Sequence, residues 1–289
     1  MKKAIFFSAI ILTFCFSAIS QVAVPRESQK QTITQNVGDA VVTIIYSRPN
    51  VKGRKIWDGL VPYGKVWRSG ANEATVFEVS RDVTINGKPL PAGKYSLHTI
   101  PAAGEWILIF NKKWDQWGSF DYDEKLDALR VAANPVPSEF FESLVYGFGD
   151  TTTSSATAFL RWEKLRVPFT IDVGDIHGRI LPQLREAIKN RKADDPRPLN
   201  QAAAYVATFK VKPSYEEALG WADASIAMKE TFGNLSAKAR LLKEQGKTAE
   251  AIANAEKAIA AGKTSTPPAN ADAIAGLEET IKGWKKNNK

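Results

Sequence analysis

The 289-residue sequence contains very little cysteine and histidine, with one cysteine and two histidines. Zinc sites are usually built from Cys and His ligands, so this composition argues against a site of that kind. The acidic run at 121–124 lacks the glycine and the distal glutamate of a calcium loop, and we expect a solvated turn there. We therefore assign no metal and no cofactor.

Common catalytic motifs are also missing. The chain has no phosphate-binding glycine loop, no dinucleotide glycine fingerprint, no zinc-peptidase helix and no Gly-x-Ser-x-Gly turn. These absences lower the expectation of an enzyme without excluding one. We assign no catalytic residue, and the question of enzymatic activity stays open.

The first twenty residues have the three-part form of a secretory signal peptide. Lys2 and Lys3 give a basic start, residues 4–19 are almost wholly apolar, and small residues precede Gln21. The apolar run is shorter than the ~20 residues that a membrane-spanning helix needs. We expect cleavage between Ser20 and Gln21, export to the periplasm or the medium, and a mature chain without cysteine.

The charge pattern argues against nucleic acid as a partner. The net charge of +8 is modest for this length, and lysine and arginine are interspersed with acidic residues. Proteins that bind nucleic acid usually mass their basic residues on one face or element. No later stretch is apolar and long enough to cross a membrane, so we expect no transmembrane segment after cleavage.

Composition changes near residue 175 and divides the chain in two. The first part is rich in Gly, Pro and Trp, with β-branched runs such as 40–46, whereas the second is rich in Ala, Glu and Lys. We predict an α+β multidomain protein. It has a signal peptide at 1–20, a linker at 21–29, an antiparallel β-sandwich or jelly-roll-like domain at 30–174, and an all-α domain at 175–289.

Strand predictions for the first domain follow from closely spaced turn signals. Asn86-Gly87 between two β-rich runs is the strongest hairpin signal. Residues 106–110 are apolar at successive positions, which predicts a strand buried on both faces. The predicted strands are 30–36, 40–47, 74–80, 82–86, 94–100, 105–111, 128–133, 141–147, 155–163 and 167–173.

Helix-length patterns fill the second domain. Ser214 followed by Glu217 has the form of a capping box. Thr248 is a predicted helix start, and Gly246 and Gly262 are predicted helix ends. The predicted helices are 180–192, 199–210, 214–231, 236–245, 248–261 and 270–285.

A weak internal repeat lies within these helices. Residues 215–219 and 248–252 are alike, and small residues recur where paired helices approach closely. The stretch 199–262 is therefore weakly similar to tetratricopeptide repeats. An ordinary array of Ala-rich helical hairpins is the alternative interpretation.

Several motifs resemble the domain-of-unknown-function family 2911. They are residues 46–49 (YSRP), 51–57 (VKGRKIW), 60–64 (LVPYG), 67–75 (WRSGANEAT) and 90–97 (LPAGKYSL). The family is common among exported proteins of Bacteroidetes-type bacteria, often with a helical extension. The resemblance covers about residues 30–173 and implies export and a β-rich domain, but it implies no activity.

The stretch 48–73 is the predicted location of a site. It is a long connection without strand signals, yet it is crowded with aromatic and basic residues, and such connections are usually functional. Arginine grips carboxylates or phosphates, glutamate can act as an acid or base, and tryptophan can stack on a sugar. The candidate ligand-binding residues are Arg48, Arg54, Trp57, Tyr63, Trp67, Arg68, Asn72, Glu73 and His98.

Three functional hypotheses stay open. We favour a non-catalytic ligand-binding or assembly module of the cell envelope, with a pocket built from 48–73 and a small molecule or an envelope protein as its partner. The alternatives are a hydrolase-type enzyme that uses Glu73, Arg68 and His98, and a helical adaptor that binds a peptide. A network of Arg68, Asn72 and Glu73 that only holds the loop is the purely structural interpretation.

Overall fold

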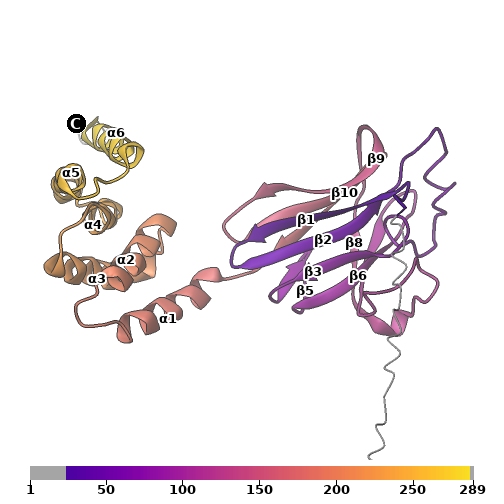
Figure 1. The fold of residues 1–289 in the computed structure, drawn as a ribbon, viewed down its shortest axis with the longest axis horizontal. Coiled ribbons are helices and arrows are strands. Elements are labelled where there is room, and N and C mark those ends of the chain that lie inside the picture. Colours follow the sequence, from indigo (N-terminus) through magenta and orange to yellow (C-terminus); the bar gives the residue numbers. More distant parts are fainter. Residues whose placement is uncertain (1–23, 287–289) are drawn as a thin grey trace, which may run out of the picture. The chain divides into compact units, whose positions relative to one another are not determined.

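The computed structural model describes residues 24–286, which form two compact units (Figure 1). The first unit ends at Asp172 and the second begins at Val173. The signal peptide predicted at 1–20, its cleavage site and the beginning of the predicted linker lie outside the described residues. Within residues 24–286, no helix combines the length and the apolar character needed to cross a membrane.

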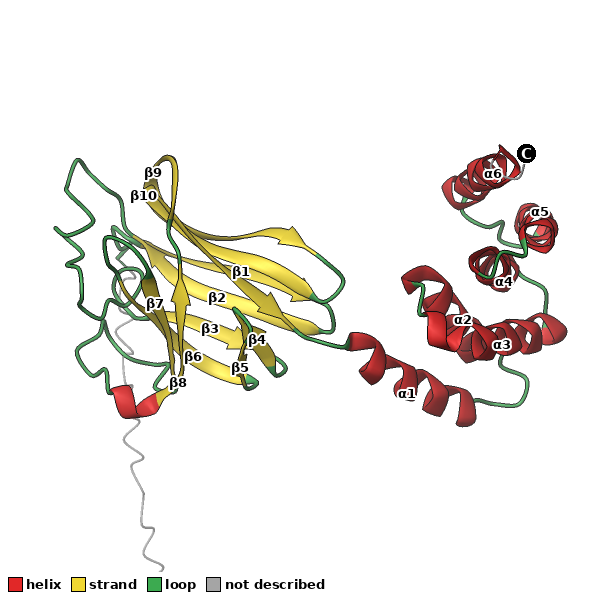
Figure 2. Ribbon diagram, turned by 180° about the vertical axis from the view of Figure 1, so that it is seen from behind, coloured by secondary structure: helices red, strands yellow, loops and turns green. Residues whose placement is uncertain are grey.

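Antiparallel strands in two sheets make up the first unit (Figure 2). They are β1 (Gln29–Val37), β2 (Ala40–Arg48), β3 (Thr75–Val79), β4 (Val83–Ile85), β5 (Lys88–Leu90), β6 (Gly93–Ile100), β7 (Trp106–Asn111), β8 (Asp127–Ala133), β9 (Val136–Thr151) and β10 (Ser155–Asp172). The six-stranded sheet has the order β1-β2-β3-β6-β7-β8, and the four-stranded sheet has the order β5-β4-β10-β9. Antiparallel sheets followed by helices confirm the predicted α+β class.

The two sheets pack against each other through buried aromatic side chains. Phe77 and Phe110 of the six-stranded sheet each lie 6.4 Å, ring centre to ring centre, from Phe169 of β10. All three rings are buried. Burying one such side chain contributes about 1.5–3 kcal/mol relative to leaving it exposed, so this layer holds the sheets together.

The second sheet differs from the prediction in one strand. The sequence predicts separate strands at 155–163 and 167–173, but β10 is continuous and shifts its register against β9 around Glu163. Glu163 has a φ of 54°, so a bulge bends the strand without ending it. The hairpin at Asn86-Gly87 is confirmed, and both residues have the positive φ that a type I′ turn requires.

Six helices follow in residues 173–286. They are α1 (Ile176–Lys189), α2 (Arg197–Phe209), α3 (Tyr215–Met228), α4 (Phe232–Glu244), α5 (Thr248–Thr264) and α6 (Ala271–Lys286). All six correspond to predicted helices. α1 begins four residues earlier than predicted, because the Asp175 side chain accepts a hydrogen bond from the Gly178 amide and caps the helix.

The capping box predicted at Ser214 is wrong. Ser214 precedes α3 with a φ of −107° and a ψ of 10°, and its side chain makes no capping hydrogen bond. A capping side chain needs the extended backbone that Thr231 has before α4, with φ −141° and ψ 159°. Thr231 and Asn234 form the capping box instead.

The predicted start of α5 is confirmed, and its predicted end is wrong. Gly246 follows α4 with a φ of 82°, and Thr248 is the first residue of α5. Gly262 lies inside α5, where an added Cβ would come within 3.1 Å of Phe232 and Ala269. Glycine therefore allows close packing at this position and does not end the helix. The tetratricopeptide resemblance stays a prediction.

Candidate ligand-binding cleft

The connection between β7 and β8, residues 112–126, covers one face of the six-stranded sheet. Phe77 faces the core, so the neighbouring Val76 and its cross-strand partner Ser96 face the opposite side. On that side the Ser96 hydroxyl donates to the Lys113 carbonyl at 2.9 Å. The Gln116 amide nitrogen donates to the same carbonyl at 2.7 Å and to the Ser96 hydroxyl at 3.1 Å. These bonds attach the middle of the connection to the sheet.

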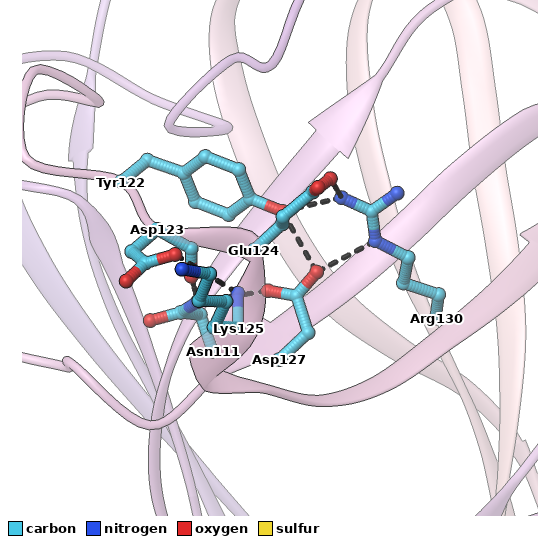
Figure 3. Close-up of polar contacts among 7 residues, drawn as sticks. All are labelled: Asn111, Tyr122, Asp123, Glu124, Lys125, Asp127 and Arg130. Carbon is cyan, nitrogen blue, oxygen red and sulfur yellow. Dashed lines mark hydrogen bonds and ion pairs between the residues drawn. The ribbon is translucent and has the colours of Figure 1, made fainter.

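A polar network anchors the end of this connection (Figure 3). The Asn111 amide donates to the Asp123 carbonyl and to Asp127 Oδ1, each at 2.8 Å. Asp127 Oδ2 accepts from the Tyr122 hydroxyl at 2.7 Å and from Arg130 Nε at 2.6 Å. One nearly buried carboxylate therefore joins strands β7 and β8 to the segment they connect. The acidic residues Asp121, Asp123 and Glu124 are exposed, as a solvated turn predicts, while Tyr122 between them belongs to the anchor.

Tyr122 and Arg130 of this network each keep one protonation state near neutral pH. Burial raises the pKa of Tyr122 to about 12, and its hydrogen bond to Asp127 adds to this effect while Arg130 opposes it. Hydrogen bonds to Asp127 and Tyr122 raise the pKa of Arg130. Tyr122 therefore stays a neutral donor and Arg130 stays a cation, so the anchor does not weaken around pH 7.

A hollow of about 350 Å³ lies between this connection and the sheet, and we call it the outer cleft. Apolar atoms of Ile45, Ala74 and Val76 contribute to its lining. Trp114 and Trp117 line it as well, and they are 42% and 53% exposed. The exposed faces of these two rings are apolar surface that a ligand or partner could cover.

Two cations lie over the exposed rings. Lys94 Nζ is 5.1 Å from the Trp114 ring centre, and the Arg26 guanidinium is 5.5 Å from the Trp117 ring centre. These distances fall within the range of cation–π attraction. The two contacts hold the rings in place while leaving much of their surface accessible.

Glu73 and Gln116 line the cleft, and each has one side-chain oxygen that is buried from solvent. Glu73 Oε1 accepts from Arg26 at 2.6 Å, whereas Glu73 Oε2 makes no hydrogen bond to another described residue. Gln116 Oε1 makes none either, although the amide nitrogen of this side chain donates twice. A buried acceptor without a donor costs free energy.

Glu73 carries a charge at neutral pH. Burial raises the pKa of this carboxyl, but the hydrogen bond from Arg26, a backbone amide and the charges of Arg26 and Lys30 outweigh burial and lower it. A deprotonated carboxylate accepts hydrogen bonds well and is poorly suited to donate a proton as a general acid.

Of the nine candidate residues, only Glu73 lines the outer cleft. Asn72 stands next to it with a φ of 60°, donates to the Ser28 carbonyl at 3.1 Å, and accepts from the Gly118 amide at 3.1 Å. Asn72 therefore connects two segments around the cleft without lining it.

Arg48 and Arg54 make hydrogen bonds to backbone carbonyls. Arg48 Nε donates to the Leu144 carbonyl at 3.0 Å, which ties β2 to β9. Arg54 donates to the carbonyls of Val51 at 3.0 Å and Asn50 at 2.5 Å. Both arginines hold the 48–73 connection in shape.

Trp57 and Trp67 belong to a cluster of four tryptophans. The Trp57 ring centre lies 4.9 Å from Trp106 and 5.8 Å from Trp162, and Trp67 stacks on Trp162 at 6.0 Å. Trp106 and Trp162 are fully buried, so the cluster is a core feature. Trp57 also lines a separate hollow of about 520 Å³ together with Tyr63.

His98 is completely buried, and both of its ring nitrogens lack a hydrogen-bond partner among the described residues. Burial, together with the charge of Arg68, lowers the pKa of His98 to about 4, although the backbone groups of Gly118 and Ser96 and the charge of Asp127 oppose the change. Burial also lowers the pKa of Arg68, whose Nε has no partner in residues 24–286. Because His98 is shielded from solvent, it is not combined with Glu73 in the outer cleft.

Sequence reasoning missed most of the outer cleft. The missed lining residues used in this argument are Lys30, Lys94, Trp114, Gln116 and Trp117. One signal was present: residues 112–126 form a second aromatic connection without strand pattern, like 48–73. Their placement beside Glu73 depends on how the strands pair, which no local pattern contains.

Within residues 24–286, no group of three or more His, Cys, Asp and Glu side chains is placed to hold a metal ion. Comparison with the curated proteins found no match. Comparison with the solved structures found none either. Residues 28–171, which span nearly all of β1 to β10, match the model of a family described as a protein of unknown function, DUF2911.

Proposed function

We propose that the sheet unit is a non-catalytic binding module that takes a saccharide in the outer cleft. The supporting observation is that two exposed indole rings, those of Trp114 and Trp117, line a cleft beside polar and charged side chains. A sugar ring has an apolar C–H face that packs on aromatic rings, and a rim of hydroxyls that both donate and accept hydrogen bonds.

The donors and acceptors in the cleft suit such a rim. Glu73 and Asp115 carry carboxylates, which accept hydrogen bonds, and Lys30 and Lys94 carry ammonium groups, which donate them. The charged side chains that line the cleft are Lys30, Lys94, Glu73 and Asp115, two of each sign, so their formal charges cancel. A neutral polyhydroxylated ligand therefore suits the cleft better than a strongly charged one.

The test is binding of the full chain to a printed glycan array, followed by titration of the glycans that bind. We expect Trp114→Ala and Trp117→Ala each to weaken binding about tenfold, since loss of an aromatic contact of about 1.4 kcal/mol corresponds to that factor. Phe140→Ala is the control, because Phe140 is an exposed aromatic outside the lining of the cleft. Unchanged affinity in both tryptophan variants would contradict the proposal.

We also propose that the chain is exported and processed between Ser20 and Gln21. The support is the basic and apolar pattern of residues 1–20. N-terminal sequencing of protein secreted by a bacterial host should give a chain that begins at Gln21. Recovery of the uncleaved chain from the cytoplasm would contradict export.

A further inference from the structure

A second hollow of about 440 Å³ adjoins the outer cleft, and we call it the N-terminal hollow. It is lined by Pro25, Arg26 and Gln29, together with Lys30 and Glu73. Lys30 and Glu73 also line the outer cleft. The two hollows are therefore neighbours that share Lys30 and Glu73 in their linings.

The segment before β1, which forms part of the wall of the N-terminal hollow, is held in place by contacts with the 48–73 connection. Glu27 forms an ion pair with Lys52, and the Ser28 carbonyl accepts from the Asn72 amide at 3.1 Å. Together with the bond from Arg26 to Glu73, three successive residues each contact the 48–73 connection or its end. The hollow is therefore a built part of the domain.

Arg26 stands at the junction of the two hollows. Its guanidinium donates to Glu73 Oε1 and lies over the ring of Trp117. The side chains of Arg26 and Glu73 are 51% and 37% exposed, so a ligand can reach the pair. Ion pairs this exposed are weak, and a ligand that crosses the junction can rearrange this one at small cost.

Two polar residues of β1 line the N-terminal hollow. They are Gln29 and Lys30, and Lys30 also lines the outer cleft. Gln29 provides both a donor and an acceptor, and Lys30 provides donors. Each hollow alone falls within the ~300–1,000 Å³ typical of small-molecule sites, so a ligand of one sugar unit would leave one of them empty.

We propose that the two hollows are adjoining subsites for an oligosaccharide of two or more units, which lies across Lys30 and Glu73. This inference rests on the proposed function, because it assumes that the outer cleft binds sugar. Gln29 is then a ligand contact of the second subsite, and the number of sugar units becomes part of the specificity.

The experiment uses the full chain and an array with one to four units of glucose, mannose, xylose and N-acetylglucosamine oligomers. We expect at least one series to bind at least tenfold more tightly at two units than at one. If one unit binds as tightly as the longer members, the second subsite is overturned and the proposed function stands. If no member binds, both proposals fail.

The variant Gln29→Ala tests the contribution of the second subsite separately from that of the first. We expect it to remove most of the advantage of the two-unit ligand and to leave the affinity for one unit unchanged. Gln35→Ala, at the other end of β1 and outside both linings, is the matched control. Equal weakening of one-unit and two-unit ligands, or no effect on either, would overturn the assignment of Gln29.

Discussion

At the scale of single residues, His98 is a polar side chain whose burial affects the stability of the fold. Its ring is fully buried beside Tyr122, with ring centres 5.3 Å apart, and has no hydrogen-bond partner among residues 24–286. An imidazolium would be costly there, so the folded protein holds the neutral ring.

This gives a stability that depends on pH. The pKa of His98 is about 4 in the folded state against an ordinary value of 6.5, so the unfolded chain binds the additional proton between these values. Stability is complete above pH 6.5 and falls as the pH drops toward 4, by about 3 kcal/mol in total. Urea unfolding at pH 7 and pH 4 should show this loss, and His98→Leu should remove it.

Thr99→Val is the control for general destabilisation. Thr99 lies on the same strand, faces the opposite side, and carries no titrating group. It should lower the free energy of unfolding by the same amount at both pH values. If His98→Leu and the wild-type chain lose equal stability on acidification, burial of the neutral ring is not the cause.

A substitution at Glu73 distinguishes saccharide binding from saccharide hydrolysis. Glu73→Gln keeps an acceptor oxygen in the cleft but loses the charge that pairs with Arg26. Because the pair is exposed, we expect stability to change by less than about 1 kcal/mol. Saccharide affinity, measured by calorimetry, should fall only a fewfold. Hydrolysis of the bound saccharide by the wild-type chain, abolished in Glu73→Gln, would favour the enzyme hypothesis instead.

At the scale of elements, the connection at 112–126 depends on Asp127. Asp127→Asn places an amide where the carboxylate accepts from Tyr122 and Arg130. Loss of charged hydrogen bonds of this kind costs about 1.5–3 kcal/mol. We expect faster hydrogen exchange in residues 112–126 and weaker saccharide binding. Asp121→Asn is the matched control, because Asp121 is exposed and contacts only Lys113, at 3.5 Å, in the described residues.

Helix α4 offers a second comparison. Thr231→Ala removes the capping hydrogen bond to the Asn234 amide and should lower stability by about 1 kcal/mol. Ser214→Ala, at the start of α3, should have little effect because its side chain does not cap. Thermal unfolding of the two variants decides this. An equal loss in both would mean that capping is not what Thr231 contributes.

At the scale of the whole molecule, the two compact units suggest a division of labour. If the outer cleft lies wholly within residues 24–172, that fragment should fold and bind saccharide with the affinity of the full chain. Circular dichroism and calorimetry of the fragment test this. Loss of binding in a folded fragment would mean that the helices take part.

Much of the architecture follows from local sequence. The β-branched run at 40–46 and the positive φ required at Asn86-Gly87 act over a few residues, so strand and turn can be located without knowing the fold. The helices were located in the same way. Errors arose where tertiary contacts override local signals: Gly262 packs against Phe232 and continues its helix, and the bulge at Glu163 joins two predicted strands.

The candidate site, like the fold, was predicted from the sequence only in part. Sequence alone determined that 48–73 is an ordered, aromatic connection, and it identified Glu73, since composition is a local property. Only the tertiary structure decided that Trp57 belongs to a buried cluster while Trp114 and Trp117 are exposed beside Glu73. The physical reason is that strand order, and not spacing along the chain, brings residues 112–126 over the face of the sheet where Glu73 lies.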